Sequence, residues 1–135
     1  MTVKDVPFAS FIGIKENEDG LSLDFKKQIQ NHVETIHASA QFTLAETKSG
    51  LYLLELLPEL NGKVVPLLRE ANIKYKKPAH EKIRAFASVD NEALDKFKMM
   101  FEKKGRASIT VKIQIKDIND VLCCFGEFSW FIQAL

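Results

Sequence analysis

The residue best placed to do chemistry is a carboxylate on the apolar side of the long hydrophobic stretch 38–57. Projected as a helix at about 100° per residue, this stretch predicts a solvent-facing stripe made of Gln41, Lys48, Glu55 and Glu59. Glu46 falls almost opposite that stripe. A carboxylate removed from water must be paired with a cation or hold its proton more tightly. Glu46 is therefore either a catalytic base or the partner of a Lys, Arg or His from the sheet, and its position alone leaves both interpretations open.

A polar segment that carries two of the three histidines leads directly into this helix. It includes Asn31 and His37, and it ends at Ser39, a residue type that commonly caps helices. The first N–H groups of a helix have no intrahelical partner, so they can bind an anion or a developing oxyanion. The alternative interpretation of His37 is a loop residue at the surface. Small side chains one turn from Glu46, Ser49 among them, leave room for a ligand and equally permit close helix–sheet packing.

The rest of the sequence predicts the elements that must position these residues. Alternating apolar and polar residues and turn signals predict strands over 11–15, 21–25, 72–77, 82–89, 108–116 and 121–133. A second, short helix begins near Asp90 and ends at Gly105. Most strands are joined without the long crossovers of a parallel sheet, so the sheet is expected to be mainly antiparallel. We therefore predict one α+β domain over residues 1–135, with a sheet curled around the long apolar helix.

Composition excludes several classes of function. The chain has 135 residues, 46% of them hydrophobic, which is enough for a core without disulfides or metal. A formal net charge of +1 argues against a general nucleic-acid or anionic-membrane binder. No stretch reaches the roughly 18 apolar residues of a membrane span. The adjacent Cys123 and Cys124 are expected to be buried free thiols. With no secretory signal at the start of the sequence, a reducing cytoplasm is the expected location.

The spacing of three polar residues resembles a known family. Asn31, His37 and Glu46, within the run His37-Ala38-Ser39-Ala40-Gln41-Phe42-Thr43-Leu44-Ala45-Glu46, are similar to the motif of the hot-dog-fold acyl-CoA thioesterases. The phenylacetate-pathway (PaaI-like) branch is the most similar. Its motif has Asn or Gln, then His-Gly-Gly, then an acidic residue on the helix that the sheet wraps. Ala38 and Ser39 stand here in place of the two glycines. Segments 69–79 and 105–107 extend the resemblance, which spans roughly residues 8–132.

The resemblance implies a hot-dog fold and thioester hydrolysis. Glu46 would act as a general base on water, or as a nucleophile that forms a mixed anhydride with the acyl group. The Ala38 N–H would hold the thioester oxygen, His37 would orient the carbonyl or the loop, and Asn31 would position water or substrate. No cofactor and no metal are expected. Residues expected to contact the substrate are Ser39, Ser49, Lys77, Arg84 and Arg106.

The implied partners are an acyl-CoA and further copies of the chain. A homodimer or a dimer of dimers is expected, in which Asn31 and His37 face Glu46 of the partner subunit. Basic residues would meet the CoA phosphates, although lysines on edge strands and cations at helix C-termini commonly have purely structural roles. The main alternative is an acyl-CoA or fatty-acid binding protein without hydrolysis, which Ala38-Ser39 in place of Gly-Gly favours. A second alternative is dehydratase or hydratase chemistry on the same fold.

Overall fold

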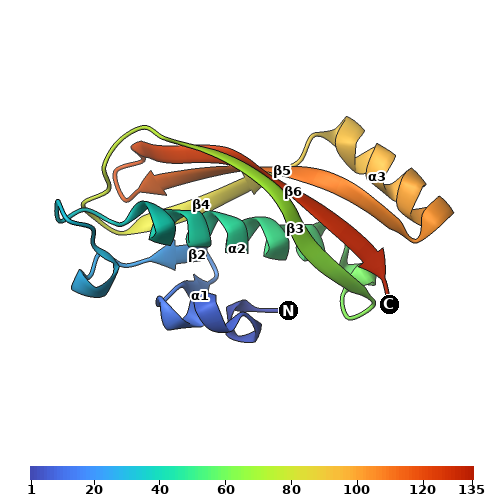
Figure 1. Cartoon of the computed structure of the whole chain (residues 1–135), viewed down its shortest axis with the longest axis horizontal. Helices are drawn as coiled ribbons and strands as arrows, with labels where there is room; N and C mark the ends of the chain where they lie inside the picture. Colours follow the sequence, from blue (N-terminus) through green and yellow to red (C-terminus); the bar gives the residue numbers. More distant parts are fainter.

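The computed structural model describes all residues from 1 to 135. Its centre is a six-stranded sheet that curves over one long helix, α2 (Ala38–Leu56) (Figure 1). Every neighbouring pair of strands is antiparallel, and the order across the sheet is β1-β2-β4-β5-β6-β3. The strands are β1 (Lys15–Asn17), β2 (Gly20–Leu23), β3 (Val64–Tyr75), β4 (Ile83–Ser88), β5 (Arg106–Asp117) and β6 (Leu122–Ala134). The predicted α+β class, with an antiparallel sheet around one central helix, is confirmed.

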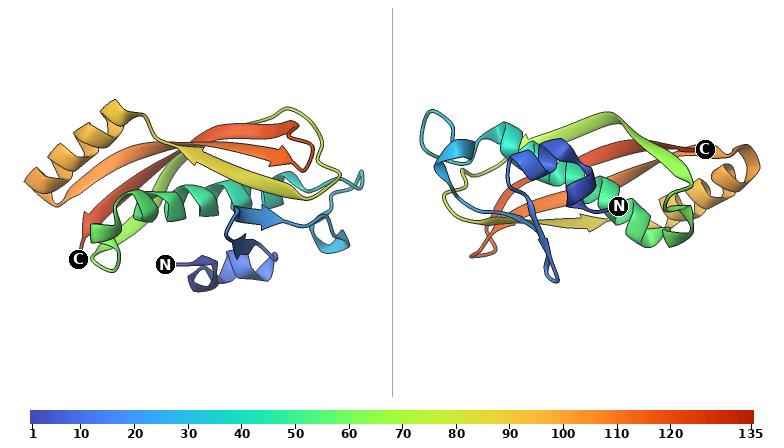
Figure 2. Two further views of the ribbon diagram at one scale, coloured as in Figure 1. Left: turned by 180° about the vertical axis from the view of Figure 1, so that it is seen from behind. Right: turned by 90° about the horizontal axis from the view of Figure 1, so that it is seen from below.

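Helix α2 is apolar on most of its surface because it is covered from two sides. The sheet lies over one side, and the short helix α1 (Pro7–Phe11) lies against the other, as the views in Figure 2 show. Leu44, Ala45 and Leu53 are almost completely buried between these layers. Burying them stabilises the fold in proportion to the apolar area removed from water.

The predicted solvent stripe of α2 is wrong at its N-terminal end. Gln41 is only 4% exposed, because its side chain lies against the loop before α2, whose Ile36 carbonyl accepts a hydrogen bond from Gln41 Nε2 at 3.2 Å. Glu59 lies beyond α2, in the 3-10 turn Pro58–Leu60. Glu55 is exposed, as predicted.

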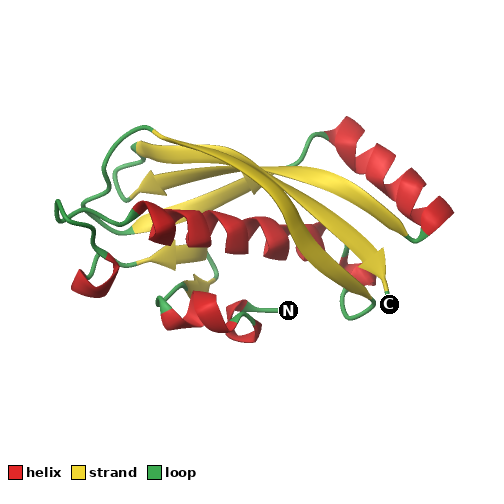
Figure 3. Cartoon of the chain, viewed as in Figure 1, coloured by secondary structure: helices red, strands yellow, loops and turns green.

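Two of the predicted strands also need correction (Figure 3). The helix α1 occupies residues 7–11, and β1 begins only at Lys15, because Pro7 suits the first position of a helix. Strand β3 begins at Val64 rather than residue 72. Its alternation is interrupted between Leu68 and Glu70, where the register with β6 shifts. Because of this bulge, one alternation of apolar and polar residues does not run through the whole strand, and the alternation over residues 72–77 did not predict its first half.

The remaining elements agree with the sequence. Helix α3 (Asn91–Lys104) ends at Gly105, whose φ of 69° is the left-handed conformation that glycine adopts at low cost. Cys123 and Cys124 are buried and free, as predicted. None of the helices combines the length and the apolar character needed to cross a membrane.

Candidate active site

The N-terminus of α2 carries one unpaired backbone donor. His37 is the N-cap residue, and its Nδ1 accepts a hydrogen bond from the Ser39 N–H at 2.9 Å. The His37 carbonyl accepts from the N–H groups of Ala40 and Gln41 at 3.0 and 3.1 Å. The Ala38 N–H is therefore the only donor of the first turn that no group in the chain accepts from. Ala38 keeps a negative φ, so alanine in place of the family's glycine causes no backbone strain here.

The ring of His37 has a defined hydrogen-bonding state. Because Nδ1 is an acceptor, the neutral imidazole carries its proton on Nε2. His37 is exposed, and the Nε2 N–H is free to donate to a ligand. The backbone carbonyl of Ser39 accepts from the Thr43 hydroxyl at 2.8 Å, which ties the first turn to the second.

Asn31 closes the loop before α2. Its Oδ1 accepts from the N–H groups of Val33 and Thr35, each at 3.0 Å, and its Nδ2 donates to the Thr35 hydroxyl at 2.7 Å. The same loop contains Glu34 in a left-handed conformation with φ 62°. Asn31 thus fixes the loop and keeps one amide hydrogen for another partner.

Asn31 and Ala38 line one shallow cavity of about 240 Å³. Lys77, another predicted substrate contact, lines it too, and so does Tyr75 at the end of β3. The Tyr75 hydroxyl donates to the Ala38 carbonyl at 3.1 Å, so β3 is joined directly to the start of α2. The other lining residues are Thr35, Ile36, Gln41, Lys76 and Pro78.

Glu46 lies at a second, larger cavity of about 490 Å³. Its side chain is half-buried, and it forms neither an ion pair nor a hydrogen bond within the chain. Burial raises the pKa of this carboxyl, and no cation nearby opposes the shift. The alternative of an ion pair with the sheet is thus not found within one chain. The cavity is mostly apolar and is otherwise lined by Met1, Val6, Thr47, Gly50, Leu51, Val64, Val65, Pro66 and Trp130.

Trp130 forms a fixed wall of the Glu46 cavity. Its Nε1 donates to the Ser49 hydroxyl at 2.8 Å, and that hydroxyl donates to the Glu46 carbonyl at 2.7 Å. The indole also packs on Gly50, where an added Cβ would be 3.0 Å from Cζ2. The Ser49 hydroxyl therefore contacts Trp130, which lines the cavity, and it has no hydrogen left to donate to a substrate. In the sequence, the small Gly50, one turn from Glu46, was the available signal for a ring packed there.

The structure places the motif residues on one helix but in two cavities. Ala38 and Glu46 are eight residues apart, or about 12 Å along the axis of α2. The cavity with Asn31 and Ala38 does not include Glu46. Within one chain, Ala38 and Glu46 therefore line different cavities.

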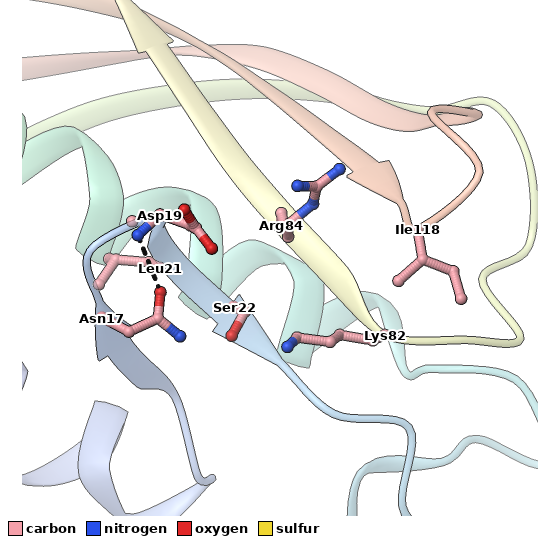
Figure 4. Close-up of a pocket in the computed structure, with 8 residues that line it drawn as sticks. Asn17, Asp19, Leu21, Ser22, Lys82, Arg84 and Ile118 are labelled. Carbon is pink, nitrogen blue, oxygen red and sulfur yellow. Dashed lines mark hydrogen bonds between the residues drawn. The ribbon is translucent and has the colours of Figure 1, made fainter.

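Arg84 lines a third, polar cavity of about 220 Å³ between the β1–β2 hairpin and β4 (Figure 4). Its Nη2 is 3.5 Å from Asp120 Oδ1, while its Nε is buried without a partner. The Ser22 hydroxyl, on the paired residue of β2, is also buried and unpaired. Figure 4 shows the Lys82 amine pointing toward Ser22. This side of the sheet is thus rich in hydrogen-bond donors.

Arg106 does not lie near the polar cavity that Arg84 lines. It begins β5, ten residues from Lys116, which pairs with Arg84. At about 3.3 Å per residue, the two arginines lie roughly 33 Å apart along the sheet. The predicted basic residues are therefore distributed among three regions of the chain, at Lys77, at Arg84 and at Arg106. No cluster of metal-ligating side chains is present.

Comparison with known proteins places the chain in a family. The sequence pattern described as "Domain of unknown function (DUF4442)" matches residues 9–132. The chain belongs to this family. Comparison with curated proteins gives no match.

Several solved structures share the fold of this DUF4442 chain. A probable thioesterase from Pseudomonas aeruginosa, PA5026, superposes with a TM-score of 0.78 at 18% identity, covering 98% of this chain and 90% of that one. The thioesterase HI1161 from Haemophilus influenzae gives 0.77 at 18% identity, covering 100% and 92%. The protein BH2602 from Bacillus halodurans, solved with CoA, gives 0.71 at 23% identity, covering 93% and 74%. Two of these three neighbours have thioesterase names, and the predicted hot-dog fold is confirmed.

Proposed function

We propose that this protein hydrolyses acyl-CoA thioesters. The observation that carries the proposal is Glu46, a half-buried carboxylate with no partner in the chain, at the edge of a 490 Å³ apolar cavity. A buried ionisable group without a structural partner costs stability, and such groups concentrate at functional sites. The thioesterase names of two hot-dog neighbours and the CoA bound to a third support the same substrate class.

Glu46 is assigned the role of general base. Its carboxylate removes a proton from water as the water oxygen attacks the thioester carbon. The Ala38 N–H donates to the oxyanion of the tetrahedral intermediate, assisted by the His37 Nε2 N–H. The intermediate then expels the CoA thiolate, which takes up the proton, leaving a carboxylic acid and free CoA. A direct attack by Glu46, with a mixed anhydride hydrolysed in a second step, uses the same groups.

The distance between Ala38 and Glu46 implies that two subunits build each site. We assign Ala38, His37 and Asn31 to one subunit and the base to Glu46 of the partner subunit. Strand β3 supports this assignment, because it is a sheet edge of twelve residues whose outer backbone groups have no partner in the chain. It also exposes the apolar side chains of Val65 and Leu67, at 40% and 49%. A long apolar edge strand is normally covered, and a second β3 would cover it.

The CoA phosphates are assigned to the basic residues. Lys77 lies in the cavity of Ala38, and Arg84 lies with Lys82 in the polar cavity of Figure 4. Arg84 Nε has no partner in the chain, and guanidinium groups bind phosphates through paired donors. Arg106 lies too far along the sheet to join them within one subunit, so its predicted contact requires a partner. The free, adjacent Cys123 and Cys124 suit the reducing cytoplasm expected from the sequence.

The test is thiol release from a panel of aromatic and straight-chain acyl-CoAs. Wild-type protein is expected to release CoA from at least one of them, and Glu46→Gln is expected to lower kcat by about 10²–10⁴ with the fold intact. An unchanged rate in Glu46→Gln would remove Glu46 from the mechanism. Absence of thiol release across the panel would contradict hydrolysis.

Binding without hydrolysis is the second candidate, favoured by the Ala38-Ser39 pair in place of two glycines. The Cβ of Ala38 narrows the approach of a thioester to its own N–H. If acyl-CoA raises the Tm of the protein but is not hydrolysed, this second candidate replaces the first.

A further inference from the structure

Gln41 carries a buried acceptor that nothing in the chain satisfies. The residue is 4% exposed, its Nε2 donates to the Ile36 carbonyl at 3.2 Å, and its Oε1 has no partner. The orientation of the amide is determined by Ile36, because the reverse orientation would bring two oxygens together. A buried acceptor in this state is stabilised only when a donor from outside the chain reaches it.

Gln41, whose Oε1 is the buried unpaired acceptor, lines the same 240 Å³ cavity as Ala38. The two residues are three positions apart on α2, so their side chains lie on one face about one helical turn apart. The cavity therefore presents an unpaired donor and an unpaired acceptor one turn apart. Lys76 and Lys77, which also line the cavity, can only donate.

A ligand that fits must present an acceptor and a donor in the same order. An acyl thioester of phosphopantetheine does so: its carbonyl oxygen accepts, and its first amide N–H lies beyond the sulfur and a short ethylene arm. We infer that Gln41 Oε1 accepts a hydrogen bond from this cysteamine amide N–H when the thioester oxygen is at the Ala38 N–H. The inference rests on the proposed function, and it makes Gln41 the residue that selects thioesters with a pantetheine arm.

The experiment compares two thioesters of the same acyl group. One is the N-acetylcysteamine thioester, which has the amide, and the other is an S-pentyl thioester, which lacks it. Wild-type protein is expected to prefer the first, and Gln41→Met is expected to lose about tenfold in kcat/KM on it while changing little on the second. An equal loss on both thioesters, or no loss on either, would overturn the inference.

Gln41→Met also removes the bond to the Ile36 carbonyl, so a matched structural control is needed. Thr43→Val removes another side-chain bond to the backbone of the same turn, from Thr43 Oγ1 to the Ser39 carbonyl, and Thr43 does not line this cavity. This variant is expected to keep the wild-type preference between the two thioesters. A lost preference in Thr43→Val would attribute the effect to the helix end rather than to Gln41.

Affinity measurements test the role of Gln41 independently of the proposed hydrolysis. The affinities of the thioether analogues of both compounds are measured in the same three proteins. If no thioester is hydrolysed, hydrolysis fails, while a lower affinity of Gln41→Met for the amide-bearing thioether alone still supports the role of Gln41. An unchanged affinity ratio overturns it. Acyl-CoA and an acyl-carrier protein carry the same arm, so Gln41→Met is expected to lose kcat/KM on both, and the one with the higher kcat/KM in the wild-type protein identifies the natural source.

Discussion

Glu46 holds a charge in a half-buried place without a cation beside it, and this has a cost in stability. Its pKa is raised by burial, so the folded chain binds the proton more tightly than the unfolded chain, in which glutamate titrates near about 4.3. Below that pH both forms are protonated and no cost arises. As the pH rises through the raised pKa, ionisation lowers the free energy of unfolding.

Glu46→Gln is therefore expected to have a higher Tm than wild type at pH 7 and the same Tm at about pH 4. Thermal unfolding of both proteins at the two pH values measures the difference. A higher Tm of Glu46→Gln together with its lower kcat would support an active-site role, because a residue that lowers stability and is needed for turnover is typical of an active site. A lower Tm of Glu46→Gln at pH 7 would mean that Glu46 has a stabilising partner.

The Ala38 N–H can be deleted without disturbing the helix. Proline is well tolerated at the first position of a helix, where its missing N–H has no intrahelical acceptor, and His37 has the extended backbone that proline requires of its predecessor, with ψ 140°. Ala38→Pro is expected to lower kcat by about 10²–10³ while circular dichroism stays unchanged. Ala38→Ser keeps the donor and is the control. Equal kcat in the two variants would exclude the Ala38 N–H as the oxyanion donor.

Residue spacing could place Glu46 on the side of α2 opposite the predicted solvent stripe, because a helix fixes which side chains share a face. The roles of His37 and Ala38 were implied only by the family resemblance. Residue spacing could not predict Gln41. A helical projection assumes that one continuous side faces water, whereas the loop closed by Asn31 packs against the Gln41 side chain and buries its amide. The side-chain hydrogen bonds of this loop join residues at irregular spacings, so no periodic pattern in the sequence predicts them.

At the scale of elements, the close approach of strands β3 and β6 depends on a glycine. A Cβ at Gly126 on β6 would be 2.3 Å from the Asn72 carbonyl oxygen and 2.8 Å from Ile73 Cα on β3. Both contacts are to backbone, so they cannot be relieved by a side-chain rotation. The approach of β3 to β6 therefore depends on the absence of a side chain at this position.

Gly126→Ala is expected to destabilise the protein by about 1–3 kcal/mol, because the strands must separate locally. Urea denaturation measures the change, and Gln133→Ala, an exposed position on the same strand, is expected to stay within about 0.5 kcal/mol of wild type. A neutral Gly126→Ala would show that the sheet can adjust its register at this point.

The boundaries of a helix or strand could be predicted where one pattern of apolar residues extended along the whole element. The alternation of β5 and the apolar length of α2 satisfied that condition, and Gly105 marked the end of α3. The first half of β3 did not satisfy it, because the bulge at its centre moves the apolar side chains to the other phase. The sequence could not predict that the motif residues line two separate cavities, because each cavity is formed by elements that are distant in the sequence.

At the scale of the whole molecule, the proposed site requires a second copy. Leu67 lies on the exposed edge strand β3, where a charged side chain would hinder pairing with another β3. Leu67→Lys is expected to shift the protein toward a monomer in analytical ultracentrifugation and to lower kcat/KM in parallel. Met99→Lys, at a 70% exposed position on α3, is the matched control and is expected to change neither. A monomeric Leu67→Lys with full activity would contradict a site shared between subunits.

Trp130 is the only tryptophan in the chain, and its indole is the wall of the cavity beside Glu46. All tryptophan fluorescence of the protein therefore comes from the indole that lines this cavity. An acyl group that enters the cavity displaces water from a half-buried indole, and the emission is expected to move to shorter wavelength. A titration of the unlabelled protein with a thioether analogue would thus report occupancy of the cavity directly, whether or not any turnover takes place.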